Sequence, residues 1–320
     1  MELTQELKDL FGDRLKESEL MSRHTNFRIG GPARFFVEVK TVDELKKVLE
    51  IARKFACATF VFGGGSNTLV SDNGFDGIVI KMAMREIQID GTRVQADAGV
   101  LMTMLSRRVC DAGWSGLEWA ISLPGTLGGA VRGNAGCFGG ETKDQLIESM
   151  VLSNGTIETR SKAELGFAYR ESFIKHSSDI VVSATFELKI GEKIEIQEKM
   201  NTFLARRKAS QPTDAGSAGC MFKNYEISSE DELQRLKLKL DLPAEMSVSR
   251  QISVGWLIDQ LDLKGMQIGG AKISDKHGNF LVNTGNATVD DVVQLIAFVK
   301  TRARDVYGII LQEEVQYVGF

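Results

Sequence analysis

The sequence contains few of the residues that build metal sites and disulfide frameworks. Its 320 residues include four cysteines and three histidines, with no CxxC pair and no metal-ligand spacing. Widely separated cysteines of this kind are typical of reduced thiols rather than of a zinc site or a disulfide framework. We therefore expect a cytoplasmic protein that binds no metal.

Signals for a membrane or a nucleic acid are also lacking. No apolar run is long enough to cross a bilayer, and the acidic, amphipathic start of the chain lacks the regions of a signal peptide. The formal net charge is −4, and the cationic residues are scattered apart from a short cluster at 206–208. We therefore expect neither a membrane nor a nucleic acid as a partner.

Two familiar nucleotide-binding signatures are missing as well. The chain has no GxxxxGK[S/T] segment, and the glycines at 63–65 do not open a GxGxxG turn with an acidic residue at the expected offset. A P-loop and a Rossmann crevice are therefore both excluded as the expected binding mode.

Glycine is present in two clusters, at 62–70 (FGGGSNTLV) and 123–136 (LPGTLGGAVRGNAG). Glycines allow backbone N–H groups to come close to phosphate oxygens and to adopt positive φ. One such cluster is common in ordinary turns. Two in one chain predict an extended anionic cofactor that is held from two sides.

The hydrophobic periodicity alternates between helical and strand-like segments and predicts an α+β protein. A capping box at Thr41–Glu44 is expected to open a helix with Leu45, Val48, Leu49 and Ala52 inward. Further helices are expected at 101–112, capped by Gly113, at 195–210 with Ile196, Met200, Phe203 and Leu204 inward, at 230–239 and at 290–306. The expected strands are 58–62, 78–80, 86–89, 93–96, 149–152, 180–188 and 309–318.

Three polar constellations are candidates for chemistry. Arg170 lies among aromatic residues, Cys220 lies in a small-residue loop beside Lys223 and Asn224, and Glu313–Glu314 lies on the expected terminal strand, where alternation sends one carboxylate to each face. Each has an ordinary interpretation, as a surface charge, a small buried hydrophobe or an exposed carboxylate. The residues alone leave both interpretations open.

The motifs in their order along nearly the whole chain resemble the UDP-N-acetylenolpyruvoylglucosamine reductase (MurB) family, in its shorter second type. Each motif is weak alone, and their order and spacing are specific. They are HTNFRIGGPA at 24–33, GGGSN at 63–67, GLE at 116–118, PGTLGG at 124–129, NAG at 134–136, YRES at 169–172, SAGCMFKN at 217–224, 272–283 with HGNF at 277–280, and LQEEV at 311–315.

The resemblance implies an FAD-binding fold of the PCMH or vanillyl-alcohol-oxidase type, with two α+β subdomains and a C-terminal α+β substrate-binding domain. The corresponding ranges are 1–80, with the terminal strand 309–320 packing on it, 81–208 and 209–320. The implied reaction belongs to peptidoglycan precursor synthesis, and thus to cell wall biogenesis, cell shape and cell division. NADPH reduces FAD, and hydride then passes from flavin N5 to the enolpyruvyl UDP-sugar, giving UDP-N-acetylmuramate.

Hydride addition places negative charge on the substrate, so the site needs cationic and hydrogen-bonding groups and an acid. By motif position, Arg170 would polarise the carboxylate, Glu314 would help to stabilise the intermediate, and Cys220 would donate the proton where serine is commoner in the family. A thiol with a pKa of about 8.5 is mostly protonated at neutral pH yet gives up its proton readily, at the cost of sensitivity to oxidation.

The other implied roles follow the motifs in the same way. Asn224 is the first candidate for binding the UDP diphosphate, followed by Lys223 and Arg207. The implied substrate-binding residues are Tyr169, Lys223 and Asn224, and the implied cofactor-binding residues are Arg28, Gly63, Gly64, Gly65, Ser66, Asn67, Pro124, Gly125, Thr126, Gly128, Gly129, Asn134, Ala135 and Gly136.

Two alternatives and one departure remain. A flavin oxidase of the same fold would pass electrons to oxygen, and a nucleotide-binding regulatory protein would not turn over NADPH. The set of Arg170, Cys220 and Glu314 argues against both. Residues 226–250, which follow Tyr225 where the family usually has proline, resemble an insertion that either covers the cleft or, as we prefer, decorates the surface.

Overall fold

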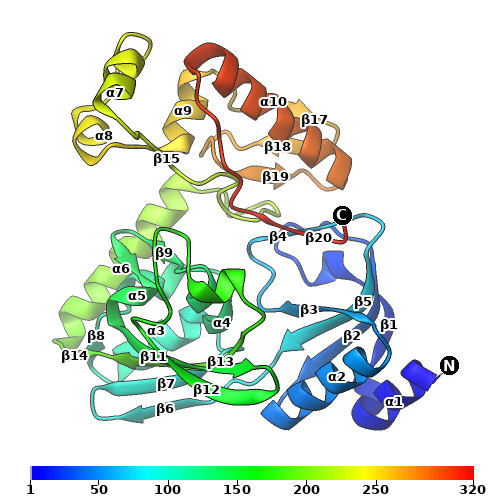
Figure 1. Ribbon diagram of the computed structural model, residues 1–320. Coiled ribbons are helices and arrows are strands. Elements are labelled where there is room, and N and C mark those ends of the chain that lie inside the picture. Colours follow the sequence, from blue (N-terminus) through cyan, green and yellow to red (C-terminus); the bar gives the residue numbers. More distant parts are fainter. Residues whose placement is uncertain (1) are drawn as a thin grey trace. The chain divides into compact units, whose positions relative to one another are not determined.

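The computed structural model describes residues 2–320, which separate into two compact units. Unit 1 contains the residues up to Leu20, Pro32–Gly65 and Gly74–Ala209, and unit 2 contains Met21–Gly31, Ser66–Asn73 and Ser210–Phe320. Figure 1 shows helices and strands mixed in both. Two segments of the expected 1–80 subdomain thus cluster with the C-terminal residues, and the expected division at residue 80 stays a prediction.

The first sheet of unit 1 has the order β1-β2-β5-β3. Its strands are β1 (Lys16–Leu20), β2 (Pro32–Val39), β5 (Phe75–Met82) and β3 (Ala58–Phe62). β1 is antiparallel to β2, whereas β2, β5 and β3 are parallel, so a crossover must join β2 to β3. Helix α2 (Val42–Lys54) forms this crossover connection. It lies beside α1 (Glu2–Phe11), as Figure 1 shows.

The start of α2 differs in one detail from the expected capping box. Thr41 Oγ1 accepts the Glu44 N–H at 3.1 Å, as predicted. The reciprocal bond is absent, because the Glu44 carboxylate instead pairs with Arg14 at 2.6 Å and accepts the Lys40 N–H at 2.7 Å. A charge-assisted contact is stronger than a neutral one, so the Glu44 carboxylate pairs with Arg14 instead of accepting the Thr41 N–H.

The second sheet of unit 1 is antiparallel, with the order β12-β11-β13-β7-β6. Its strands are β6 (Ile87–Asp90), β7 (Arg93–Asp97), β11 (Leu146–Ser153), β12 (Thr156–Ser161) and β13 (Ile180–Glu187). Both sheets contribute to one apolar core that includes Phe35, Ile78, Val94, Val151 and Phe186.

Helices α3 (Met102–Asp111), α4 (Leu127–Arg132) and α6 (Lys193–Ser210) complete unit 1. Ile196 and Met200 of α6 are buried, as expected, but Leu204 is 40% exposed and its inward assignment is wrong. It follows Phe203 by about 100° around the helix, which turns it away from the narrow buried stripe. The shorter elements are η1 (Gly12–Arg14), β8 (Trp114–Ser115), η3 (Glu118–Ser122), β9 (Gly136–Cys137), β10 (Gly140–Glu141), α5 (Thr142–Gln145), η4 (Phe173–His176) and β14 (Lys189–Ile190).

Unit 2 is built around a three-stranded antiparallel sheet and α10. A capping box between Thr288 and Asp291 opens α10, and Gly308 at φ 73° ends it. Its elements are η2 (Met21–Arg23), β4 (Thr68–Val70), β15 (Tyr225–Glu226), α7 (Glu230–Lys237), α8 (Ala244–Ser249), β16 (Gln251–Ile252), α9 (Val254–Gln260), β17 (Gln267–Ile268), β18 (Ala271–Ile273), β19 (Leu281–Asn283), α10 (Val289–Tyr307) and β20 (Gln316–Val318).

The end of the chain forms less strand than the sequence predicted. Instead of a strand over 309–318, β20 covers three residues and pairs in parallel with β4, while Glu313 forms an isolated bridge to Phe222. The expected insertion at 226–250 lies between β15 and β16 and buries Leu233 and Leu236 in the core of unit 2. That this segment decorates the surface, as preferred from the sequence, stays a prediction. No helix over residues 2–320 is long and apolar enough to cross a bilayer.

Candidate active site

The two glycine clusters meet inside unit 1. A Cβ atom at Gly63 would lie 2.5 Å from Thr126 Oγ1, and one at Gly64 would lie 2.8 Å from Gly125 Cα. Real side chains do not tolerate such distances, so glycine is required for the loop after β3 to approach the loop before α4. The loops at 63–65 and 124–126 therefore approach each other closely in the backbone, and their role in holding a cofactor stays a prediction.

Thr126 places a polar group at this meeting point. Its side chain is 6% exposed, and its hydroxyl has no hydrogen-bond partner among the residues that the structure describes. Thr126 is the N-cap residue of α4, yet its side chain makes no capping bond. A buried hydroxyl without a partner is costly and is typical of a site that a polar ligand completes. Close backbone approach and this hydroxyl fit a phosphate-bearing cofactor such as FAD.

Asn134, in the third predicted cofactor segment, anchors its surroundings. It is fully buried and has φ 41°, in the left-handed region. Its Nδ2 donates to Ala168 O at 2.9 Å and to Glu141 Oε2 at 3.0 Å, while its Oδ1 accepts the Lys143 N–H at 3.1 Å. The amide therefore ties the 134–136 loop to the turn that carries Arg170.

Arg170 is held in an unusual conformation at the tip of that turn. The turn is closed by a bridge between Ala168 and Glu171, and Arg170 has φ 57°, which is uncommon for a long side chain. Its Nη2 donates to Gly136 O at 3.0 Å, and its guanidinium lies 5.1 Å from the centre of the Tyr169 ring. Strained residues of this kind cluster at functional sites, which favours the functional interpretation of Arg170.

The predicted proton donor and glutamate lie on neighbouring segments of unit 2. The Glu314 N–H donates to Met221 O at 2.8 Å, and the Lys223 N–H donates to Gln312 O at 2.9 Å. These bonds set the segments antiparallel around the bridge between Phe222 and Glu313. Cys220 and Glu314, distant in sequence, are thus brought to adjacent strands.

Glu313 is engaged by side chains of its own surroundings. Lys300 Nζ lies 2.6 Å from Glu313 Oε1, and the Tyr317 hydroxyl donates to Glu313 Oε2. Burial, together with the bond to Glu313, raises the pKa of Tyr317. Glu313 therefore takes part in a structural ion pair, and the choice of Glu314 for the chemistry stays a prediction.

Three predicted cofactor residues, Arg28, Ser66 and Asn67, belong to unit 2. Asn67 Nδ2 donates to Glu314 O at 3.1 Å, and Asn67 O accepts the Gln316 N–H at 3.0 Å, so this residue helps to hold the Glu314 segment. Arg28 is exposed at φ 58°. The cofactor roles of these three residues stay predictions.

The predicted substrate residue Asn224 contacts the start of α9. Its Oδ1 accepts the Val254 N–H at 3.3 Å, and its Nδ2 donates to Gln251 Oε1 at 3.5 Å. Lys223 and Tyr169 are both half-buried. None of these contacts involves a nucleotide, so the roles assigned to Tyr169, Lys223 and Asn224 stay predictions.

One residue of functional interest was not singled out from the sequence. Asn279 is 2% exposed and lies in the turn between β18 and β19, beside the Cys220 strand. Its Oδ1 accepts the Phe222 N–H at 2.9 Å, and its Nδ2 donates to Phe222 O at 2.8 Å. The HGNF stretch at 277–280 was the only sequence signal that pointed to it.

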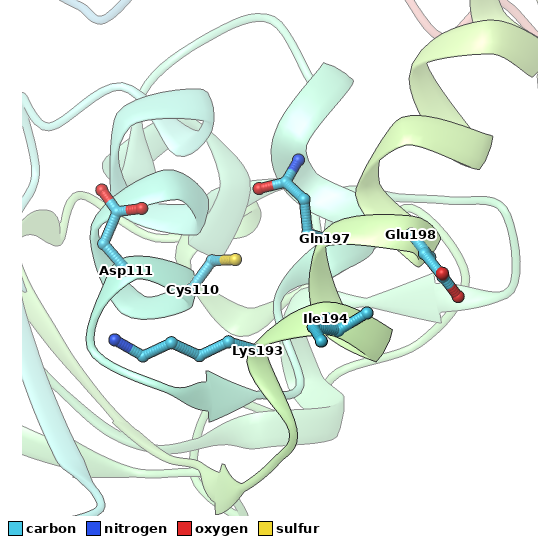
Figure 2. A pocket seen from close by; sticks show the side chains of 6 residues that line it. All are labelled: Cys110, Asp111, Lys193, Ile194, Gln197 and Glu198. Carbon is cyan, nitrogen blue, oxygen red and sulfur yellow. The ribbon is translucent and has the colours of Figure 1, made fainter.

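A hollow of about 410 Å³ lies elsewhere in unit 1, between the end of α3 and the start of α6 (Figure 2). No predicted site residue lines it. Cys110 at its wall is 5% exposed, and burial raises the pKa of its thiol, which disfavours a nucleophilic role. Over residues 2–320, no group of three or more histidine, cysteine or acidic side chains could hold a metal ion.

Comparisons with known proteins match both parts of the chain. Residues 33–161 match the model of the FAD binding domain, and residues 211–318 match that of the UDP-N-acetylenolpyruvoylglucosamine reductase C-terminal domain. The reductase of Anoxybacillus flavithermus is 40% identical over 309 residues, which cover 95% of this chain and 94% of that protein. The reductase of Caldanaerobacter subterraneus is 36% identical over 320 residues, covering 99% and 98%.

A solved structure agrees with these relatives. The crystal structure of UDP-N-acetylenolpyruvylglucosamine reductase (MurB) from Thermus caldophilus is 34% identical and has a TM-score of 0.77, covering 95% of this chain and 99% of that one. The matches confirm the α+β class and the FAD-binding fold predicted from sequence. The chain therefore belongs to the UDP-N-acetylenolpyruvoylglucosamine reductase family and is a flavin-dependent oxidoreductase.

Proposed function

We propose that this protein reduces UDP-N-acetylenolpyruvoylglucosamine to UDP-N-acetylmuramate, a step in peptidoglycan precursor synthesis, with NADPH as the reductant. The proposal rests on family membership and on one observation in particular. A thiol and a carboxylate that the sequence assigned to the same reaction, those of Cys220 and Glu314, belong to adjacent hydrogen-bonded segments.

The glycine clusters supply the expected binding groups for FAD. Gly63, Gly64 and Gly125 give close backbone approach, and Thr126 supplies a buried hydroxyl in need of a partner. Held by these residues, FAD would supply hydride transfer between NADPH and the vinyl terminus of the substrate. The remaining chemistry is assigned to the side chains of the protein.

Arg170 is assigned to the carboxylate of the substrate. A guanidinium presents two parallel N–H groups that match the two oxygens of a carboxylate. Its bond to Gly136 O and its left-handed backbone restrict the orientations of the side chain before substrate arrives. Such preorganisation stabilises negative charge that develops during the reaction.

Cys220 is assigned to protonation of the carbon next to the one that receives hydride. A thiol can give its S–H proton to a developing carbanion, which is the chemistry of a general acid. Glu314, on the neighbouring segment, is assigned to stabilisation of the intermediate.

The test follows the flavin absorbance under anaerobic conditions, adding NADPH and then the enolpyruvyl UDP-sugar. The wild-type flavin should bleach with NADPH and regain its colour with the sugar nucleotide. Cys220→Ala should still bleach but regain colour at least about 100-fold more slowly, the lower range for loss of a general acid, whereas Cys220→Ser should retain activity.

Cys57→Ser serves as the control, because Cys57 is a half-buried thiol outside the proposed site. It should behave like the wild type in both half-reactions. Normal recovery of colour in Cys220→Ala would refute the assignment of the proton donor. Recovery only on admission of air would refute the reductase and support a flavin oxidase instead.

A further inference from the structure

The extended segment that carries Cys220, called the Cys220 strand here although it pairs only through isolated bridges, has neighbours on both edges. On one edge, the bonds from Glu314 N–H to Met221 O and from Lys223 N–H to Gln312 O flank the bridge between Phe222 and Glu313. In such an antiparallel pair, the N–H and C=O of the bridged residue point to the opposite edge. Phe222 therefore needs a hydrogen-bond donor and an acceptor on its other side.

Asn279 provides both. Its side-chain Oδ1 accepts the Phe222 N–H at 2.9 Å and its Nδ2 donates to Phe222 O at 2.8 Å, while its backbone carbonyl accepts the Met221 N–H at 2.8 Å. The Asn279 side-chain amide thus forms the two hydrogen bonds that the backbone of a neighbouring strand residue would otherwise form with Phe222. Phe222 is 1% and Asn279 2% exposed, so solvent does not supply these bonds instead.

His277 forms a hydrogen bond with the backbone of Asn279. Its Nδ1 accepts the Asn279 N–H at 3.2 Å, a bond that requires the ring to be unprotonated at this nitrogen. A Cβ atom at Gly255 would lie 2.6 Å from His277 Cε1, so α9 packs tightly against the ring. Burial lowers the pKa of His277, which favours the neutral acceptor form.

We propose that Asn279 is a positioning residue for proton transfer, which sets the placement of Cys220 relative to Glu314 by fixing the Met221–Phe222 backbone between them. The inference rests on the proposed function. Without the amide, two buried polar groups of Phe222 lose their partners and the strand shifts to satisfy them. A misplacement of about 1 Å can cost about 100-fold in rate.

The test compares the two half-reactions of the flavin-loaded enzyme by stopped-flow absorbance. In Asn279→Ala, recovery of flavin colour with the enolpyruvyl UDP-sugar should slow by about 10- to 100-fold, while bleaching by NADPH stays within about twofold of wild type. The solvent deuterium isotope effect on recovery should rise, because protonation then limits the rate. A role confined to stability would not produce this split.

Ser274→Ala is the matched control. Ser274 lies in the same turn and is 4% exposed, and its Oγ accepts the Lys276 N–H at 3.2 Å, a bond that involves no residue of 217–224. Both half-reactions should stay unchanged in this variant. Where Asn279→Ala does not fold, Asn279→Asp is used instead, because it keeps the shape and the acceptor but loses the donor to Phe222 O.

Hydrogen exchange gives a readout that is independent of turnover. Exchange should rise in the peptide 217–224 of Asn279→Ala and not in the peptide 93–112. Unchanged recovery, or equal slowing of both half-reactions, would overturn the positioning role while the function stands. A wild-type flavin that the sugar nucleotide fails to reoxidise would instead refute the proposed function, and the positioning role with it.

Discussion

Replacing Thr126 by valine should have opposite effects on the apoprotein and on the binding of FAD. The hydroxyl of Thr126 is buried, has no partner in the described residues and does not cap α4. Valine has nearly the same shape and keeps the branched Cβ, so packing against Gly63 is preserved. The substitution therefore removes one polar group and little else.

The size of each effect follows from the state of the hydroxyl. An uncompensated buried hydroxyl costs about 1–3 kcal/mol in proteins, so its removal should stabilise the apoprotein by about 1 kcal/mol. That corresponds to a rise in Tm of about 2–4 °C for a unit of this size. A hydrogen bond to a charged group contributes about 1.5–3 kcal/mol, so the dissociation constant for FAD should rise about 10- to 100-fold.

Two measurements check the prediction: thermal unfolding of the flavin-free protein, and titration of FAD by quenching of its fluorescence. Thr142→Val provides the contrast, because the Thr142 hydroxyl is fully buried but donates to Ala135 O at 2.9 Å. That variant should lose stability as an apoprotein. Unchanged FAD affinity in Thr126→Val, or a lower Tm, would refute the reasoning.

Three further predictions concern the same molecule. Gly64→Ala should weaken FAD binding by about 1–3 kcal/mol, because its Cβ would overlap Gly125, whereas Gly133→Ala, whose Cβ would meet its nearest atom at 3.5 Å, should bind normally in the same titration. Stability should fall below pH 6.5, because burial lowers the pKa of His277 from its ordinary 6.5, so the unfolded chain takes up the proton first. When the free energy of unfolding is measured by urea titration at several pH values between 5 and 8, it should depend less on pH in His277→Gln than in the wild type. An equal pH dependence would contradict this. Arg170→Lys should slow flavin recovery by the sugar nucleotide about 10-fold or more while leaving bleaching by NADPH intact, since lysine cannot form the bidentate contact. Equal recovery would remove Arg170 from the proposed site.

Elements with strong local signals were predictable from the sequence. β3 begins and ends at the predicted residues, and α3 and α10 differ from their predicted bounds by one residue at each end. The pairing of β4 with β20, of three residues each, had no local signal, and only the family resemblance implied that the end of the chain packs on residues 1–80. Strands this short carry no readable alternation, and their parallel pairing depends on the folded chain rather than on neighbouring residues.

The glycine clusters stand out in the sequence, and the backbone requires glycine at Gly63 and Gly64, but their role in binding a cofactor stays a prediction. The cofactor role predicted for Thr126 rests on its family motif, since a buried threonine with a satisfied hydroxyl has the same sequence signature. The role proposed for Asn279 was harder still to infer from the sequence. Its importance depends on which way the Phe222 N–H and C=O point, and this is set by pairing with a segment about 90 residues further along the chain.

The experiments can be told apart because they change residues of different units. Gly63, Gly64 and Thr126 belong to unit 1, whereas Cys220 and Glu314 belong to unit 2. Substitutions at the glycine loops should change the amount of bound FAD and so the amplitude of both half-reactions. Substitutions on the Cys220 strand should change the rate of the second half-reaction alone, because the first requires no proton from the thiol. A lower amplitude of the flavin absorbance change therefore indicates loss of the cofactor, whereas a lower rate of flavin reoxidation indicates loss of the acid. The two causes can be distinguished even where both variants lose the same amount of overall turnover.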